Sequence, residues 1–155
     1  MTIEKRLEEL NIILPQPPQR AGMYRQTKTF GEKLLYVSGC GPDLNGVCEL
    51  KGRLGKEVDI PTGQYAARCC MLNALAILKR DLGDLDRIGN IVKMLAFVSS
   101  DDAFYDQPLV ANGASEFLMQ VFGEEIGCPS RSAIGTSVLP GNIPVEIEIL
   151  VELKD

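Results

Sequence analysis

One arginine stands alone in an otherwise uncharged stretch near the end of the chain. Arg131 is the only charged residue between Pro129 and Val145, and Glu146 follows directly after that stretch. A guanidinium forks onto a carboxylate with two parallel, charge-assisted hydrogen bonds, which fix its position and its orientation together. Arg131 is therefore expected either to hold the carboxylate of a small ligand or to form a salt bridge with Glu146 or Glu148 at a subunit interface.

The amino-acid composition limits which catalytic, metal and redox sites are expected. The chain contains no histidine, which removes the commonest general base and the commonest metal ligand. Its five cysteines form no C-x-x-C pair, so a zinc ribbon or a thioredoxin-like redox site is not expected. Cys69 and Cys70 lie in a helical pattern and are expected to pack in the core. Cys40, which has a glycine on either side, is either a spectator or a reactive thiol at the mouth of a cleft, and Cys128 is a similar case.

Size and charge limit the class of protein. With 155 residues, 45% of them hydrophobic and 24% charged, the chain has the composition of a soluble globular protein and is expected to fold as one domain over residues 1–155. Its net charge of −5 argues against a nucleic-acid or anionic-membrane partner, which needs a basic surface. The first residues lack the apolar region of a signal peptide, and no apolar run approaches the ~20 residues that cross a bilayer, so a cytoplasmic location is expected.

The N-terminal residues are expected to form an extension of their own. Ile3, Leu7 and Leu10 share one helical face, and a threonine before them is a candidate cap. Three closely spaced prolines then end the helix and predict an extended connector. Residues 1–20 are therefore interpreted as a helix followed by a proline-rich segment.

The elements between the two ends predict an α+β fold. Segments whose apolar residues recur at helical spacing alternate along the chain with segments of strand spacing. Glycine, proline and asparagine separate these segments. Two helices against one face of a mixed sheet make a two-layer sandwich. The predicted elements are, in order, strands at Tyr24–Phe30 and Leu34–Ser38, a short strand within Glu49–Leu54, a helix at Thr62–Leu82 capped by Thr62, a strand at Ile91–Val98, a helix at Pro108–Phe122, and strands at Arg131–Leu139 and Val145–Leu153.

The last strand predicts which face of the sheet is covered. Branched apolar residues alternate with glutamates along Val145–Leu153, so one face is expected beneath the helices. The second face is then left for solvent or for another subunit. An oligomer built on that second face is therefore expected.

Several short motifs resemble those of a known family. R-S-A-I-G-T-S-V-L-P, starting at Arg131, and the V-E-I-E that follows it are similar to the C-terminal signature of the reactive intermediate deaminase family, also called RidA, YjgF-like or endoribonuclease L-PSP. A-G-M-Y at 21–24, Y-V-S-G-C-G-P at 36–42 and G-D-L-D-R-I at 83–88 resemble other family motifs and come in the right order. The resemblance covers residues 22–153, so the N-terminal extension is expected to mark a longer branch of the family.

The resemblance implies a chorismate-mutase-like fold and a homotrimer with ligand clefts between its subunits. It also implies an activity, the hydrolysis of small 2-imino acids to 2-keto acids and ammonia. A protonated imine is already electrophilic, so the reaction requires no metal and no cofactor. By resemblance, Arg131 clamps the substrate carboxylate, and Glu146 positions a water and accepts or relays a proton. The matching ligand-contact positions are Tyr24, Ser38, Gly39, Asn112 and Ala133.

Two positions depart from the family pattern. Ala133 stands where many active members have a cysteine, and Cys40 stands where glutamine is common. Both departures put the standard substrate in question more than the fold. Simpler interpretations also remain for four candidates. Glu146 is also explained as a solvated strand residue, Asn112 as an ordinary helix residue, and Tyr24 and Ser38 as strand residues placed by packing alone.

Two further functions compete with the imine hydrolase. A trimeric sensor or binding protein for a 2-keto acid or a similar small carboxylate would use Arg131 equally well, because carboxylate capture does not imply turnover. A ribonuclease is less consistent with the sequence. RNA binding requires neutralisation of phosphates, and this chain is acidic and has no histidine.

Overall fold

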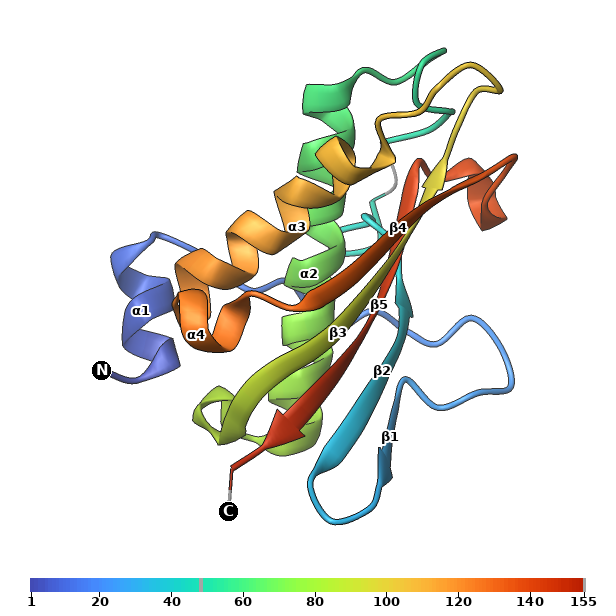
Figure 1. Ribbon diagram of the computed structural model, residues 1–155. Coiled ribbons are helices and arrows are strands. Elements are labelled where there is room, and N and C mark those ends of the chain that lie inside the picture. Colours follow the sequence, from blue (N-terminus) through green and yellow to red (C-terminus); the bar gives the residue numbers. More distant parts are fainter. Residues whose placement is uncertain (48, 155) are drawn as a thin grey trace.

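A five-stranded mixed sheet with two long helices on one face forms the body of the molecule (Figure 1). The computed structural model describes residues 1–47 and 49–154; Cys48, one of the five expected thiols, lies outside them. The strand order is β1-β2-β5-β3-β4, and every neighbouring pair is antiparallel except β3 with β4, which is parallel. The predicted α+β two-layer fold is confirmed. The strands are β1 at Thr27–Phe30, β2 at Leu34–Cys40, β3 at Ile88–Ser99, β4 at Ser130–Thr136 and β5 at Val145–Leu153.

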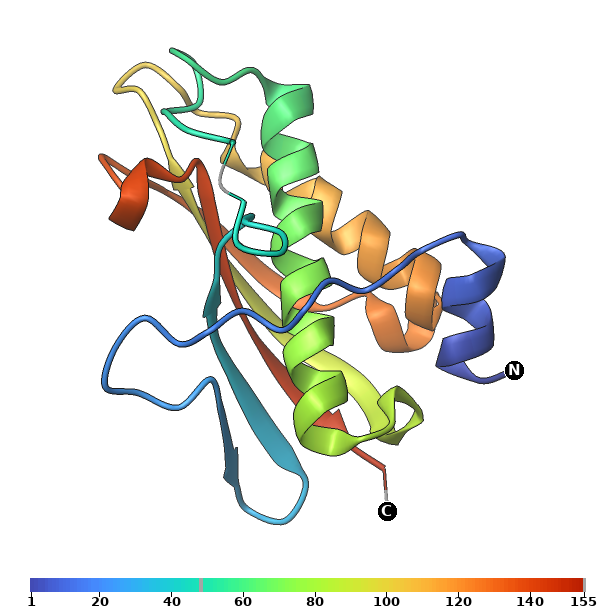
Figure 2. The ribbon, with the colours of Figure 1, turned by 180° about the vertical axis from the view of Figure 1, so that it is seen from behind.

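The two long helices pack across one face of this sheet (Figure 2). They are α2 at Ile60–Leu82 and α3 at Gln107–Phe122, and each ends before a glycine, as expected. The cap of α2 differs from the prediction. Asp59 replaces Thr62 in that role, because the Asp59 carboxylate accepts a hydrogen bond from the Thr62 backbone N–H at 2.9 Å and a proline fits the first turn.

The alternation of β5 sorts its side chains as predicted. Val145, Ile147, Ile149 and Val151 are buried beneath the helices. Cys69 and Cys70 of α2 are also buried, which confirms their place in the core. The opposite, open face of the sheet keeps glutamates and several apolar side chains partly exposed, among them Tyr36 and Ile134.

Several predicted strands have different limits in the structure. Glu49–Leu54 is not a strand, since Leu54 forms only isolated bridges and glycines on either side of it hold positive φ angles. β4 ends at Thr136 rather than Leu139, because Thr136 faces Ser99, the last residue of its partner strand. The first strand begins at Thr27 rather than Tyr24, so Tyr24 lies in the preceding loop.

The N-terminal extension is fastened to the rest of the molecule. Its helix α1, Ile3–Glu9, is capped by Thr2 as predicted and buries Leu7. The Ile3 backbone N–H donates to Asp86 Oδ1 at 2.8 Å, and Arg6 Nε donates to a backbone carbonyl at the end of α3 at 2.9 Å. The following connector passes over α2 on its way to β1 (Figure 2). Within the described residues, no helix is long and apolar enough to span a membrane.

Candidate functional site

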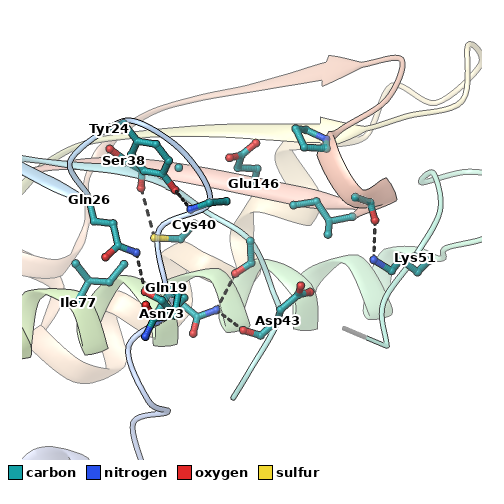
Figure 3. Close-up of a pocket in the computed structure, with 17 residues that line it drawn as sticks. Gln19, Tyr24, Gln26, Ser38, Cys40, Asp43, Lys51, Asn73, Ile77 and Glu146 are labelled. Atoms are coloured by element: carbon teal, nitrogen blue, oxygen red, sulfur yellow. Dashed lines mark hydrogen bonds between the residues drawn. The ribbon is translucent and has the colours of Figure 1, made fainter. Parts of the chain in front are cut away.

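A pocket of about 340 Å³ lies where β2 runs past the start of β1 (Figure 3). Thr27 of β1 pairs with Val37, so the outer edge of β2 beyond Val37 has no strand beside it. The register of β2 against β5 also shifts between Val37 and Cys40, which turns Ser38 and Gly39 out of the regular ladder. The pocket is called the acid pocket below. Four of the predicted site residues line it together: Tyr24, Ser38, Gly39 and Glu146.

The Glu146 carboxylate lies against the backbone of Gly39. A Cβ atom added at Gly39 would collide with Glu146 Oε1 and would lie 2.9 Å from its Cδ. Only glycine leaves room for the acid in this position. Partial burial and, to a smaller extent, the negative charge of Glu148 raise the pKa of Glu146. The carboxylate is therefore a better proton acceptor than an exposed glutamate.

The other two members are held by hydrogen bonds to the loop before β1. Ser38 Oγ donates to the backbone carbonyl of Arg25 at 2.7 Å, and the Ser38 backbone N–H donates to Gln26 at 2.9 Å. The Tyr24 hydroxyl accepts from the Ala21 backbone N–H at 3.3 Å. Tyr24 thus closes a small loop at the pocket rim with its side chain 40% exposed, where a ligand can reach it.

Cys40 lies in the same pocket but is buried. Burial, followed by the nearby charge of Glu146, raises the pKa of the Cys40 thiol to about 12. Because the thiolate is the nucleophilic form, the structure supports the spectator interpretation of Cys40. Cys128, the other thiol left open by the sequence, is exposed and does not line this pocket.

Arg131 lies elsewhere, on the helix-covered side of β4. Its Nη1 donates to Asn112 Oδ1 at 2.9 Å and to Ser115 Oγ at 3.1 Å, and its Nη2 donates to the Pro108 carbonyl at 3.3 Å. Ala133 is the next residue of β4 on the same face. Arg131, Asn112, Ser115 and Ala133 are called the arginine cluster below.

These contacts bear on two residues whose roles the sequence left open. Asn112 helps to hold the guanidinium, because its Oδ1 atom accepts a hydrogen bond from Arg131. Among the residues that the structure describes, Arg131 forms no ion pair, so the salt bridge to Glu146 or Glu148 is absent within the chain. Ser115 was missed by the sequence reasoning, although its position three residues after Asn112 places both on one helical face.

The structure does not bring the acid pocket and the arginine cluster together within one chain. β3 separates their strands: Met94 faces Arg131, whereas Phe97 faces Glu146. Arg131 and Glu146 are thus two strands apart across the sheet and three residues apart along it. This places their Cα atoms on the order of 14 Å from each other. Their side chains also leave opposite faces of the sheet, because Arg131 reaches α3 while Glu146 alternates with residues buried beneath the helices.

One group of potential metal ligands occurs among the described residues, away from the pocket. The carboxylates of Glu4, Asp84 and Asp86 lie within 4.8 Å of one another. All three already have structural partners. Glu4 pairs with Lys79, Asp86 accepts from the Ile3 backbone N–H, and Asp84 accepts from the Asp86 backbone N–H. None of the three lines the acid pocket.

The mixed sheet, the helices on one face and the pocket at the edge of β2 define an α+β protein of the chorismate-mutase-like kind. The sequence pattern of the family described as "YjgF/chorismate_mutase-like, putative endoribonuclease" matches residues 4–153. The chain belongs to this family. The match includes most of the N-terminal extension, which the motifs alone had placed outside the family core.

Similar proteins cover nearly the whole chain. The protein TCP17 of Trypanosoma cruzi is 40% identical over 151 residues, which are 96% of this chain and 92% of that protein. The crystal structure of Atu1372 from Agrobacterium tumefaciens, of unknown function, is 40% identical with a TM-score of 0.88 and matches 99% of this chain and 94% of its own. A "putative endoribonuclease" from Shewanella oneidensis is 31% identical with a TM-score of 0.94, and the match covers 99% of this chain and 100% of that one.

Proposed function

We propose that this protein hydrolyses small 2-imino acids to 2-keto acids and ammonia at clefts between the subunits of a homotrimer. In each cleft, the acid pocket of one subunit faces the arginine cluster of the next. One observation carries the proposal: a single chain holds both halves of the predicted site, but β3 and the thickness of the sheet keep them apart. A second copy of the chain supplies the missing half to each.

The open face of the sheet supports self-association. Phe30 and Tyr36 stack there with ring centroids 5.2 Å apart, and Tyr36 is 48% exposed. Ile134 at the other edge of the same face is 45% exposed. Apolar side chains spread over one sheet face are typical of a surface that another subunit covers.

The arginine cluster is suited to holding a carboxylate. A guanidinium has five N–H groups, and three are used by Asn112, Ser115 and the Pro108 carbonyl. The three acceptors fix the plane of the group, while its remaining N–H groups are left for a bidentate contact with a substrate carboxylate. No charge on the same chain competes for them, because Arg131 forms no ion pair within the described residues.

The acid pocket would then carry out the chemistry. Glu146 holds a water and accepts its proton as the water oxygen bonds to C2 and the C=N electron pair moves to nitrogen. The resulting carbinolamine takes that proton on its nitrogen. The C–N bond then breaks with loss of ammonia, and the remaining hydroxyl gives its proton to that ammonia as the C=O bond forms. The water and the protonated imine are consumed, the keto acid and ammonium are released, and Glu146 is restored.

An imine assay tests the proposed function. 2-Iminopropionate or 2-iminobutyrate is generated in situ, and the loss of the imine is followed with and without the protein. We expect acceleration, and Arg131→Ala should lower kcat/KM about 100-fold, equivalent to about 2.7 kcal/mol of transition-state binding. Glu152→Gln, a matched change on the strand and face of Glu146 but outside the pocket, should retain the wild-type rate.

The same variants separate the other two functions. A binding protein would show no acceleration, but 2-keto acids would raise the melting temperature of the wild type and not that of Arg131→Ala. A ribonuclease would cleave RNA in an Arg131-dependent way after removal of contaminants. The acid pocket counts against that outcome, because Glu146 and Asp43 would repel phosphates.

A further inference from the structure

Asn73 is a buried polar residue in the apolar middle of α2. Its side chain is 2% exposed and lines the acid pocket. The Nδ2 group donates both hydrogens, to the Gly41 carbonyl at 2.9 Å and to the Asp43 carbonyl at 2.8 Å. These two bonds fix the orientation of the amide, because the reverse orientation would set Oδ1 against two carbonyl oxygens. The buried Oδ1 atom has no hydrogen-bond donor among the described residues.

Asp43 adds a second acceptor of the same kind. Its Oδ1 atom is also buried without a donor among the described residues, and Asp43 lines the same pocket. Figure 3 shows Asn73 and Asp43 together on the α2 side, with Glu146 on the sheet side. Buried acceptors without donors destabilise a fold, so two of them at one pocket point to a ligand that supplies donors.

The N-terminal extension covers this part of the pocket. Pro18 and Gln19 line the acid pocket and also a second hollow that borders Asp43. The connector is held in place there, because the Pro18 carbonyl accepts from Gln26 Nε2 at 2.8 Å and the Gln16 backbone N–H donates to an asparagine next to the Asp43 loop at 2.9 Å. The extension therefore encloses the end of the pocket where the two acceptors lie.

We propose that Asn73 and Asp43 select 2-imino acids whose side chain ends in a hydrogen-bond donor. This inference rests on the proposed function. With the carboxylate on Arg131 of a second copy and the imine carbon at Glu146, the substrate side chain extends towards α2. A donor on that side chain satisfies Asn73 Oδ1 and Asp43 Oδ1, whereas an alkyl side chain leaves both acceptors buried and unpaired. A site built to hydrogen-bond a substrate discriminates strongly against an isostere that lacks the donor.

An isosteric substrate pair tests the selection. The 2-imino acids formed by an amino-acid oxidase from asparagine and from leucine have side chains of the same shape, but only the first carries N–H donors. We expect kcat/KM to favour the asparagine-derived imine by about tenfold or more. The imine formed from arginine should also be preferred over the leucine-derived one, because its guanidinium carries donors and a positive charge next to Asp43.

Variants identify the residues responsible. Asn73→Leu should reduce or reverse the preference, and so should Asp43→Asn, which keeps its shape and presents a donor in place of an acceptor. Gln120→Leu makes the same amide-to-alkyl change on α3, away from the pocket, and should keep the wild-type ratio. Equal rates for the two imines, a preference for the leucine-derived one, or a preference that survives both pocket variants would overturn the inference.

The selection by Asn73 and Asp43 can also be tested if the protein hydrolyses no imine. If neither imine is hydrolysed faster than in buffer, the proposed function fails, and binding tests the selection separately. The 2-keto acids that correspond to asparagine and leucine are then compared by their effect on the melting temperature. A larger increase with the amide-bearing acid, lost in Asn73→Leu, supports the inference, and an equal or smaller increase overturns it.

Discussion

At the residue scale, the acid pocket depends on the close approach of Gly39 and Glu146. The motifs single out both residues but could not predict their contact, because it arises from the pairing of β2 with β5 and from the irregular register beside Gly39. The three acceptors around Arg131 were equally out of reach, since α3 and β4 meet only in the folded chain. Residue types and motif order could be predicted, but not which residues share a site within one chain.

Adding a single methyl group at position 39 should inactivate the protein. In Gly39→Ala the new Cβ displaces the Glu146 carboxylate, and a displacement of about 1 Å in a catalytic group costs about 100-fold in kcat/KM. Steady-state kinetics checks this, with circular dichroism as a test of folding. Gly22→Ala is the matched control, because its Cβ meets only ordinary contacts at 3.6 Å. Wild-type activity in Gly39→Ala would contradict the role of Glu146.

The pH dependence should follow the environment of Glu146. Burial and the charge of Glu148 raise the pKa of Glu146, and the proposed mechanism requires its ionised form. Activity is therefore expected to fall as the pH decreases through this raised pKa. Glu148→Gln removes one of the two causes and should move the acidic limb of the kcat/KM profile to lower pH. An unchanged limb, or a shift to higher pH, would show that another group controls the rate.

The same shift predicts a change in stability. Because the pKa of folded Glu146 is raised above its unfolded value, its contribution to stability is present at low pH and is lost as the pH rises through the folded pKa. Glu146→Gln should therefore be more stable than the wild type at neutral pH. The difference should decrease as the pH falls through the raised pKa of folded Glu146 and should vanish below the unfolded pKa of about 4.3, as followed by urea denaturation. A loss of stability at neutral pH would indicate that the carboxylate has an unrecognised structural partner.

At the scale of elements, periodicity predicted most of the frame. α2 and β5 were found from their apolar patterns, because packing on one face leaves a strong mark in the sequence. Strand ends were predicted less well. β4 ends opposite the last residue of its partner β3, and β1 begins only at Thr27 although β2 runs on past Val37. The close crossing of α2 and α3 is marked in the sequence by a glycine on each helix, Gly63 and Gly113. A Cβ at Gly113 would lie 2.8 Å from the Cα of Gln64, so the two backbones nearly touch there.

The close approach of the two helices determines whether an alanine at position 113 stabilises or destabilises the protein. Gly113→Ala should stabilise an isolated helix by about 1 kcal/mol, but here it forces α2 and α3 apart at an expected net cost of about 1–3 kcal/mol. It should also disturb Asn112 and thereby the arginine cluster. Chemical denaturation measures the first effect and imine kinetics the second. Gln120→Ala, at an exposed position of the same helix, should change stability by less than about 0.5 kcal/mol. Increased stability in Gly113→Ala would contradict the close approach of the α2 and α3 backbones at this position.

At the scale of the whole molecule, the proposed cleft joins two groups of residues that lie apart in one chain, and the open face of the sheet carries exposed apolar side chains. Ile134→Glu places a charge on that face without touching the acid pocket or the contacts of Arg131. The variant should lose the proposed trimer in light scattering and lose the proposed imine hydrolysis with it, while its circular dichroism spectrum is retained. A monomeric variant with full activity would show that each chain works alone.

Mixing two inactive variants tests the shared cleft most directly. Arg131→Ala and Glu146→Gln are combined as subunits in equal amounts, and imine hydrolysis is measured before and after exchange. If each cleft takes Glu146 from one subunit and Arg131 from the next, random mixing in a closed ring restores both residues in about a quarter of the clefts. The mixture should therefore recover about a quarter of the wild-type activity. Continued inactivity after confirmed exchange would contradict a cleft shared between two copies.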